Sequence, residues 1–415
     1  MSDSDIKNSE NVLIQENITE NTETPKVVDL ESFEFNEVKK WDDFDLPSSI
    51  LRGIYSHGFE NPSPIQMKGI LPIMKGRDVI AQSQSGTGKT ATFVIGALSR
   101  IDLNEKMVQA LVLVPTRELA CQIEQVFEGI GMGLENLKTH VLVGGRSIDE
   151  SVKSLKYDHP QVVIGCIGRT CDMLKRRALN LSSLRLLIID EADEMLSYGF
   201  REDVYHILDS IPIKRQVVVF SATMSTDIID RLEEITTKAI HITVKKEALT
   251  LEGISQYYIA LENDQHKYET LKDIYSSVSM SHCIIYCNSV NRVKDLTDSM
   301  KNDGFPVCCI HSDMEKRLRE ESINNFRGGG SRVLISSDVT ARGIDIQQVS
   351  IVINFDVCNS VHTYLHRIGR SGRWGRKGIG INFITRRDVD KLRKIEQHYS
   401  TQINELPGNF MTTLA

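Results

Sequence analysis

Leu186-Leu187-Ile188-Ile189-Asp190-Glu191-Ala192-Asp193 places three carboxylates directly after four apolar residues. Such an apolar run is typical of a strand that is buried on both faces of a parallel sheet. Acidic side chains at the end of a buried strand are costly unless a cation or a proton transfer uses them. The stretch therefore predicts an α/β fold with a chemical site at the end of this strand.

A glycine-rich loop supplies the second signal, earlier in the chain. Gly86 and Gly88 permit backbone conformations that bring N–H groups close to phosphate oxygens. Lys89 can balance the charge of terminal phosphates, and Thr90 can hold Mg²⁺ through its hydroxyl. Together with the acidic strand end, the loop predicts a site that hydrolyses a nucleoside triphosphate. The candidate nucleotide-binding residues are Ser83 (where this motif usually has glycine), Gln84, Ser85, Gly86, Thr87, Gly88, Lys89 and Thr90.

The three acidic residues of this stretch have different expected roles. Asp190 is the expected Mg²⁺ partner, directly or through water. Glu191 is the candidate base that orients or deprotonates the attacking water. We expect Asp193 to bond to Ser221 or Thr223, which follow the next strand along the chain. Any one of these carboxylates alone could be a solvated helix cap, but the set favours a catalytic site.

Composition limits the class of protein. The 415 residues are 40% hydrophobic and 25% charged, which fits a soluble globular protein of two or three domains. Residues 1–40 hold ten acids and four lysines, so they account for -6 of the net charge of -7. The net charge of residues 41–415 is therefore close to -1. Because these residues are nearly neutral as a whole, any surface that binds nucleic acid must be a local basic strip. We interpret residues 1–40 as a disordered acidic tail, either a solvating leader, which we favour, or a partner-docking segment.

Three features that the sequence lacks indicate the cellular compartment. No run of about 18 apolar residues predicts a membrane span. The acidic N-terminus is unlike a signal peptide. The eight cysteines contain no CxxC pair, so free thiols in a reducing compartment are expected. We therefore expect a cytosolic or nuclear protein.

Short β-branched runs alternate with helical stretches from Trp41 onward, and they form two sets. This alternation predicts two α/β domains, each with a parallel sheet covered by helices. We expect an N-terminal domain at 41–243, a linker at 244–252 and a C-terminal domain at 253–415. The expected strands are Val79–Ala81, Ala110–Val114, Val141–Val143, Gln161–Ile164, Leu184–Ile189 and Gln216–Phe220, then Cys283–Tyr286, Val307–Ile310, Arg332–Ile335, Ile351–Asn354 and Ile379–Phe383.

From about Trp41 to Leu406 the chain resembles a DEAD-box RNA helicase, which implies two tandem RecA-like domains. The stretch Gly58-Phe59-Glu60-Asn61-Pro62-Ser63-Pro64-Ile65-Gln66 resembles the adenine-reading motif of that family. Gln66 can read the N6 and N7 edge of adenine with its amide. Phe59 offers a stacking face, although a core role is the ordinary alternative. Trp41 stands where the family has an isolated upstream aromatic residue.

The resemblance also implies an RNA path and a second half of the active site. Asp345 is expected to touch the ribose, and Arg370 and Arg373 are expected to be arginine fingers. His366 is expected to couple the two domains through Asp193, Ser221 and Thr223. The implied RNA-contacting residues are Thr116, Arg117, Gly145, Arg169, Asn288, Asp313, Arg319 and Ser337.

Arginine fingers stabilise transition-state charge by roughly 10³–10⁵ in rate. An arginine-rich turn alone is usually a solvated surface. Here it lies far along the chain from the phosphate loop, so hydrolysis should require the two domains to close. RNA that spans both domains would favour that closed state.

Three stretches resemble the translation initiation factor 4A group, which includes an exon-junction paralogue: Leu249-Thr250-Leu251-Glu252-Gly253-Ile254, Trp374-Gly375-Arg376-Lys377-Gly378 and, most strongly, Ile395-Glu396-Gln397-His398-Tyr399-Ser400-Thr401-Gln402-Ile403. We expect an ATP- and Mg²⁺-dependent RNA helicase, monomeric, cytoplasmic or also nuclear, with a scaffold partner in translation initiation or mRNA metabolism. One alternative is a slow ATP-dependent RNA clamp of the exon-junction type. A DNA helicase with the same core is a further alternative.

Several positions depart from the family pattern. Cys166-Ile167 replaces a usual Thr-Pro, and a thiol is a weaker hydrogen-bond donor than a hydroxyl, which costs about 1 kcal/mol of RNA contact. Ser312 replaces a glycine and Lys316 a glutamine. We therefore predict an active ATPase with altered affinity for RNA.

Overall fold

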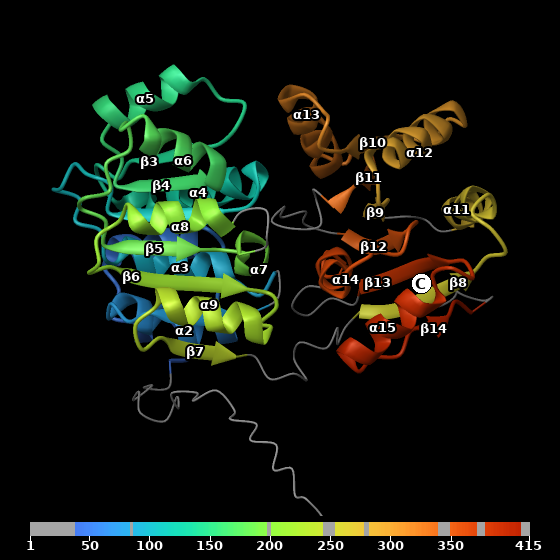
Figure 1. The fold of residues 1–415 in the computed structure, drawn as a ribbon, viewed down its shortest axis with the longest axis horizontal. Coiled ribbons are helices and arrows are strands. Elements are labelled where there is room, and N and C mark those ends of the chain that lie inside the picture. The colour runs from blue at the N-terminus through green and yellow to red at the C-terminus, as the bar shows by residue number, and fades with distance from the viewer. Residues whose placement is uncertain are drawn as a thin grey trace, which may run out of the picture.

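The computed structural model describes residues 38–83, 86–196, 201–243, 254–277, 282–338, 349–371 and 378–407. These residues form two lobes, each built on its own sheet, and we name them the first lobe (38–243) and the second lobe (254–407) (Figure 1). The predicted tail lies outside the described residues except for 38–40, and the whole predicted linker lies outside them too. Those two predictions stay predictions.

The first lobe contains a seven-stranded sheet of parallel strand pairs, in the order β3-β4-β2-β5-β6-β1-β7. Side chains alternate between its two faces, so Val112 and Val114 enter one apolar core while Leu111 and Leu113 enter the other. The strands are β1 (Val79–Gln82), β2 (Ala110–Val114), β3 (Thr139–Leu142), β4 (Val162–Cys166), β5 (Leu186–Ile189), β6 (Gln216–Ser221) and β7 (Ile240–Thr243).

Helices cover both faces of this sheet. One face carries α1 (Ser48–Ser56), α2 (Pro64–Met74), α3 (Lys89–Leu98) and α4 (Arg117–Ile130), with the short helices η2 (Trp41–Asp43) and η3 (Gly131–Gly133) beside them. The other face carries α5 (Ile148–Tyr157), α6 (Ile167–Lys175), α7 (Ala192–Met195), α8 (Arg201–Asp209) and α9 (Thr226–Ile235).

The second lobe repeats this architecture. Its sheet has the order β10-β11-β9-β12-β13-β8-β14, again with parallel pairs. The strands are β8 (Ile254–Ala260), β9 (His282–Tyr286), β10 (Val307–Ile310), β11 (Val333–Ser336), β12 (Val349–Asn354), β13 (Gly378–Ile384) and β14 (Asn404–Glu405). One face packs on α13 (Lys316–Arg327), α14 (Val361–Ile368) and α15 (Val389–Tyr399), and the other on α11 (His266–Ser277) and α12 (Val290–Asn302).

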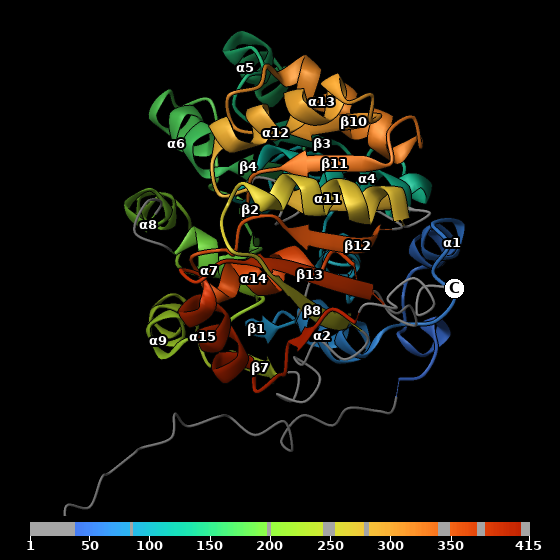
Figure 2. The ribbon, with the colours of Figure 1, turned by 90° about the vertical axis from the view of Figure 1, so that its right-hand side faces the viewer.

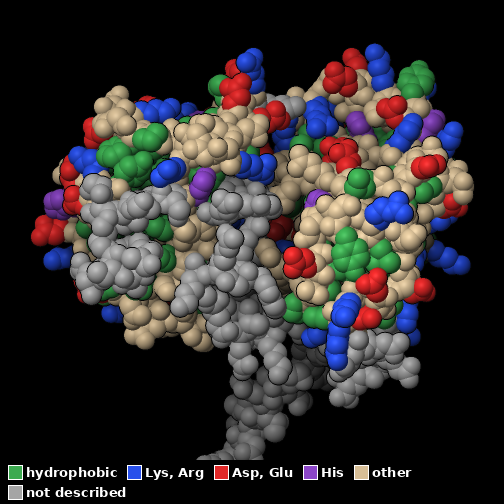
Figure 3. All heavy atoms as spheres, turned by 180° about the vertical axis from the view of Figure 1, so that it is seen from behind, with side chains coloured by type: hydrophobic (Ala, Val, Ile, Leu, Met, Phe, Trp, Pro, Cys, Tyr) green, Lys and Arg blue, Asp and Glu red, His purple; other side chains and the backbone are tan. Residues whose placement is uncertain are grey.

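The lobes face each other across the edge where the strands of the first sheet end (Figures 1 and 2). Seen from behind, the surface is hollowed between the lobes, and Lys and Arg side chains are interspersed with Asp and Glu over both (Figure 3). Groups that follow the first sheet's strands are therefore brought toward the second lobe. The mixed charge on this face agrees with a chain whose folded part is close to neutral.

The prediction of two helix-covered parallel sheets is confirmed, and each predicted strand overlaps an observed one. Strands β7, β8 and β14 were not predicted, because polar residues interrupt their apolar pattern, as in Ile254-Ser255-Gln256-Tyr257. All eight cysteines are free thiols, as expected. Among the described residues, no helix is both long and apolar enough to cross a membrane.

Candidate active site and RNA-facing surface

The acidic strand end is a buried cluster around one lysine. Asp190 follows β5 and is 2% exposed, and Glu191 is 3% exposed. The Nζ atom of Lys89 lies 3.2 Å from Oε1 of Glu191 and 4.0 Å from Oδ1 of Asp190. The backbone of Glu191 has a left-handed φ of 54°, which turns the chain sharply from β5 into α7. The turn places the cluster at the carboxyl edge of the sheet.

The charged groups in this cluster shift each other's pKa values. Burial alone would lower the pKa of Lys89, but the nearby carboxylates outweigh it and raise that pKa. Burial raises the pKa of Asp190 to about 7, with Lys89 opposing the rise and Glu191 adding to it. An additional cation at this position would relieve the cost of the buried carboxylates. The oxygen-rich donor set therefore fits Mg²⁺, which prefers hard oxygen ligands.

The phosphate loop has the backbone that an anion cradle needs. Gly86 and Gly88 have φ values of 83° and 103°, which side-chain-bearing residues rarely adopt. A Cβ atom on Gly88 would come within 2.6 Å of Nε2 of Gln66. The hydroxyls of Ser83 and Thr87 hydrogen-bond across the loop, and Thr90 lies half-buried in the first turn of α3. Gln84 and Ser85 lie outside the described residues.

Gln66 ties the adenine-reading motif to the phosphate loop. Its Oε1 accepts a hydrogen bond from the N–H of Ser63 at 2.7 Å, and its Nε2 donates to the carbonyl of Gly88 at 3.4 Å. Phe59, seven residues before Gln66, is half-buried, and its ring centroid lies 6.3 Å from that of Trp41. Trp41 is fully buried. Any effect of Trp41 on a nucleotide would therefore pass through Phe59, and adenine recognition by these residues stays a prediction.

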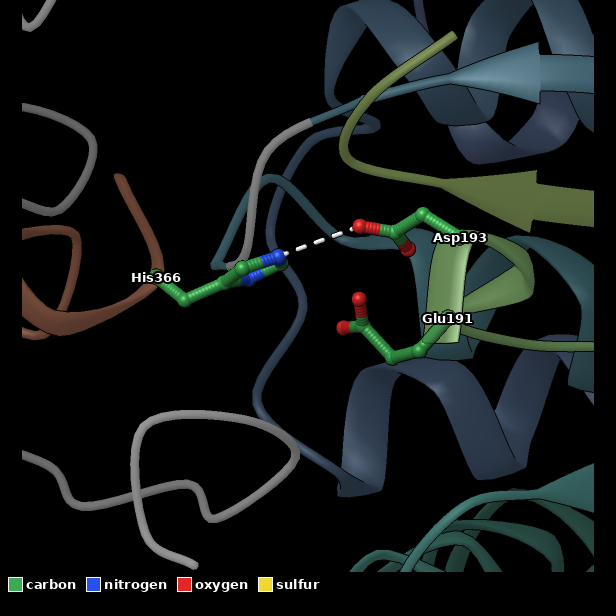
Figure 4. Close-up of side chains that lie close together, drawn as sticks. All are labelled: Glu191, Asp193 and His366. Atoms are coloured by element: carbon green, nitrogen blue, oxygen red, sulfur yellow. Dashed lines mark hydrogen bonds and ion pairs between the residues drawn. The ribbon is translucent and has the colours of Figure 1, made fainter. Parts of the chain in front are cut away.

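Asp193 is the centre of a network that joins the lobes, and Figure 4 shows its contact with His366. Its Oδ1 accepts from the hydroxyl of Ser221 at 3.1 Å, and its Oδ2 accepts from that of Thr223 at 3.0 Å. From the second lobe, Nε2 of His366 lies 3.3 Å from Oδ2 of the same carboxylate. The four residues that the sequence assigned to coupling are thus brought together.

The arginine-finger region is described only in part. Arg370 follows α14, is 8% exposed, and donates from Nε to the carbonyl of His366 at 3.3 Å. It therefore lies one helical turn from the residue that touches the first lobe. Arg373 and the ribose candidate Asp345 lie outside the described residues, as does the side chain of Lys316, so their predicted roles are untested.

The predicted RNA-contacting residues follow strand ends in both lobes. Thr116 begins α4, and its hydroxyl accepts from the N–H of Leu119. Arg117 donates to the carbonyl of Gly144 at 3.1 Å, beside Gly145, which has a φ of 78°. Arg169 donates to the carbonyl of Arg146 at 3.0 Å. These contacts hold a basic patch at the carboxyl edge of β2, β3 and β4.

The second lobe places its predicted RNA contacts in the same way. Asn288 follows β9 and donates from Nδ2 to the carbonyl of Val357. Asp313 follows β10 and lies 3.5 Å from Nζ of Lys294. Ser337 follows β11 and is buried. Arg319 lies on α13. Sequence reasoning thus placed these residues at one edge of the sheet.

Sequence reasoning missed Arg367, which holds the strand ends of the second lobe together. Its fully buried guanidinium stacks 5.1 Å from the ring centroid of Tyr286. It bonds to Asp338 at 2.6 Å, Asn354 at 3.2 Å, Asn288 at 2.8 Å and the carbonyl of Asp356 at 2.8 Å. Its place beside His366 was visible in the sequence, but partners so far apart along the chain were not.

Two crossed ion pairs between the lobes were also missed. Arg319 of the second lobe lies 2.8 Å from Glu118 of the first, and Arg117 of the first lies 3.4 Å from Glu320 of the second. They border a hollow of about 580 Å³ between α4 and α13. Each lobe thus offers one acid to the predicted RNA-contacting arginine of the other, and acids at helix positions gave no signal of this.

A phosphate loop and acidic strand end in one lobe, facing arginines in a second lobe of similar fold, define a two-lobed nucleoside triphosphatase of the helicase type. Two family models match, DEAD/DEAH box helicase at residues 63–232 and helicase conserved C-terminal domain at 266–375. The chain is 49% identical over 374 residues to the ATP-dependent RNA helicase eIF4A of Scheffersomyces stipitis, covering 90% of this chain and 94% of that protein. It is 51% identical over 369 residues to eIF4A of Aspergillus clavatus, covering 89% and 92%.

Among solved structures, S. cerevisiae Dbp5 bound to RNA and ADP BeF3 is similar with a TM-score of 0.83 and 30% identity, over 91% of this chain and 98% of that one. The chain belongs to the DEAD-box family of ATP-dependent RNA helicases, in the eIF4A group. It is an RNA-binding enzyme that hydrolyses ATP.

Proposed function

We propose that this helicase hydrolyses ATP in a composite site that is complete only when RNA holds the two lobes together, and that it acts in translation initiation. The observation that carries the proposal is the contact of His366 with Asp193. That contact joins the acidic strand end directly to the helix that precedes Arg370. The state of the RNA-bound lobes is thereby linked to the residues beside the nucleotide.

In the first lobe, the phosphate loop binds the triphosphate and Lys89 neutralises its terminal charge. Lys89 bonds to Glu191 in this structure, and a terminal phosphate would draw it toward the loop. Glu191 then orients the attacking water and accepts its proton. Gln66 and Phe59 hold the adenine, with Trp41 behind them. The hydrogen bond from Gln66 to Gly88 supports this because it links the base-reading residue to the loop.

Thr90 and Asp190 are the residues that would hold Mg²⁺. When bound, this ion supplies positive charge that offsets the developing charge of the transferred phosphoryl group. The buried carboxylates of Asp190 and Glu191 support this assignment.

In the second lobe, Arg370 and Arg373 stabilise the charge of the transition state, and Asp345 contacts the ribose. Closure is required because Arg370 sits on the other lobe from Lys89. The arrangement of the lobes supports this step, because Dbp5 with RNA and ADP BeF3 bound has the same overall fold at a TM-score of 0.83.

RNA crosses both lobes through contacts to phosphate and sugar, made by Thr116, Arg117, Gly145 and Arg169 in the first. Asn288, Asp313, Arg319 and Ser337 continue the path in the second. Contacts of this kind give little base specificity. A strand held by both lobes is bent away from a partner strand, so short duplexes are opened locally.

The relatives named eIF4A support a role in translation initiation. We propose a monomeric protein that binds a scaffold protein of the initiation machinery and works mainly in the cytoplasm and also in the nucleus. A slow clamp of the exon-junction type would instead hold RNA for long periods without turnover. The rate of ATP turnover on saturating RNA separates these two modes.

The test is steady-state ATP hydrolysis with and without single-stranded RNA, using the full chain and its Arg370→Ala and Arg373→Ala variants. We expect RNA to stimulate the parent strongly and both variants to lose most of that stimulation while still binding RNA. Arg386→Ala, on the loop after β13, is the control that should keep parental rates. Variants that hydrolyse ATP as fast as the parent under saturating RNA would contradict the composite site.

A further inference from the structure

A second hollow lies in the first lobe, at the edge of the sheet opposite to the candidate active site. Its volume is about 810 Å³. Its residues come from the segment before β2, from the end of α5 with the turn before β4, and from the turn after α6. All three segments lie at the ends of the sheet where strands begin. We call this site the amino-edge hollow, and neither nucleotide nor RNA contacts were assigned to it.

The amino-edge hollow has a cationic rim and an apolar floor. The rim holds Lys106, Lys156, Arg176 and Arg177, together with His159, and none of the described residues that line it is acidic. Arg176 bonds to Asp172, which is not part of the lining, at 2.8 Å. The floor is made of Met107, Val108, Val152, Leu155, Pro160 and Ala178. A ligand that fits this surface carries several negative charges with apolar side chains between them.

The lining favours an acidic polypeptide over RNA. Proteins that hold single-stranded RNA stack its bases on several aromatic side chains, and among the described residues that line the hollow His159 alone has an aromatic ring. Exposed Tyr157 lies next to the hollow in sequence, and Nζ of Lys156 lies 5.4 Å from its ring centroid. An apolar floor without stacking platforms suits aliphatic side chains instead.

The chain itself contains a segment of this chemistry. Residues 10–23 hold four acids, no lysine or arginine, and the apolar residues Val12, Leu13, Ile14 and Ile18. We infer that this segment docks in the amino-edge hollow of its own first lobe, with its carboxylates on the cationic rim and its aliphatic side chains on the floor.

The length of the connection permits this docking. Val38, where the described chain begins, packs in the apolar core on one face of the first sheet. Val108 and Leu155 of the hollow belong to the core on the other face, so the tail must pass around the sheet. Residues 19–37, which separate the aliphatic residues of the segment from Val38, span at most about 65 Å when extended, and half the circumference of a lobe roughly 40 Å across is about 63 Å. Tethering raises the effective concentration of the segment to about the millimolar range.

Zero-length carbodiimide cross-linking of the full chain tests the contact, because it joins a lysine only to a carboxylate that it touches. We expect cross-linked peptides that join Lys106 or Lys156 to the acids of residues 10–23. These should be several-fold more abundant than peptides that join Lys214 to the same acids. Lys214 is the matched control because it is an exposed lysine of the same lobe. The yield should fall at high salt, since screening weakens the pairing.

Three outcomes of that experiment would overturn the inference. Equal linkage of Lys106, Lys156 and Lys214 would mean that the tail samples the surface without preference. Links could instead form only between two molecules, with a yield that rises with protein concentration. That result would mean that the hollow binds the tail of a second copy of the chain. Loss of the links when single-stranded RNA is added would assign it to RNA.

A charge variant of the tail gives an independent readout. Changing Glu10, Glu16, Glu20 and Glu23 to Gln keeps the size of each side chain and leaves the folded lobes untouched. We expect faster hydrogen exchange at residues 104–109 and 155–160 in this variant and unchanged exchange in α12. Identical exchange in all three regions would sink the proposal.

Discussion

Glu191 shows how much of the chemistry depends on a single conformation. Its left-handed backbone turns the carboxylate toward Lys89 at the end of β5, where burial removes competing water. A residue in this region of φ and ψ costs about 1–3 kcal/mol, and it persists because the surrounding structure enforces it. The position therefore combines strain with function, as the proposed role requires.

Glu191→Gln should lower RNA-stimulated ATP turnover by about 10²–10⁴-fold, because the amide cannot accept the proton of the attacking water. Nucleotide and RNA binding should be kept, since the side chain retains its size. Turnover and equilibrium binding measured on the same preparation check this. Glu150→Gln, on the exposed side of α5, should behave like the parent. Turnover near the parental rate in Glu191→Gln would remove Glu191 from its proposed role.

Cys166 gives a pH-dependent prediction at the same scale. Burial raises the pKa of its thiol to about 12, and the nearby charge of Glu118 adds to the rise. The raised pKa means that the reactive thiolate forms only at strongly alkaline pH. At pH 8, roughly one thiol in 10⁴ is ionised in the folded protein.

Alkylation of Cys166 by iodoacetamide should therefore be much slower in the native protein than in the urea-unfolded protein at pH 8. The native rate should increase with each step toward pH 10. Mass spectrometry of the labelled peptide measures both rates. Equal native and unfolded rates at pH 8 would show that the thiol is exposed and has an ordinary pKa.

The starts of helices α4 and α6 differ in how they are capped. Thr116 caps α4 by accepting from the N–H of Leu119. Cys166 occupies the corresponding position of α6 with an extended backbone, and its side chain makes no capping hydrogen bond. The first N–H groups of α6 are thus left for water or for phosphate.

Cys166→Thr should therefore stabilise the protein by about 0.5–1 kcal/mol and tighten RNA binding, because a hydroxyl caps and donates better than a thiol. The reverse exchange Thr116→Cys is the matched control and should destabilise it by a similar amount. Urea unfolding and RNA titration measure the two effects. A loss of stability in Cys166→Thr would mean that packing against the thiol outweighs the cap.

Elements also show what the sequence can and cannot predict. Strand β2 has the bounds expected from its unbroken apolar run, Ala110–Val114. Strand β8 escaped prediction because Ser255 and Gln256 interrupt its pattern near the edge of the sheet. Asp193 and Ser221 could be paired in advance because neighbouring parallel strands end at the same edge. The partners of Arg367 could not, because no local spacing fixes which polar groups meet a buried guanidinium.

At the scale of the whole molecule, polar contacts between described residues join the two lobes at two places. His366 to Asp193 lies beside the nucleotide, and the crossed ion pairs lie beside the expected RNA path. Both side chains of the pair Arg319–Glu118 are mostly buried, at 18% and 12% exposure. Closure should therefore depend measurably on this pair.

A double-mutant cycle of Arg319→Ala and Glu118→Ala should give a coupling energy of about 0.5–1 kcal/mol for lobe closure. Fluorescence energy transfer between dyes on the two lobes reports the closed fraction without nucleotide or RNA. The pair Arg176 and Asp172 is the control, because it lies wholly within the first lobe and should show no coupling to closure. Additive effects in the first cycle would mean that the pair does not stabilise closure.

The arginines of the two crossed ion pairs should make the activity of this enzyme depend on salt concentration. Arg117 and Arg319 are attached both to acids across the gap and, by proposal, to the sugar–phosphate chain. Dissolved ions weaken both kinds of attraction. Raising the ionic strength should therefore weaken RNA binding and also favour separation of the two lobes. ATP hydrolysis should then decline more steeply with salt than the number of phosphate contacts alone would suggest.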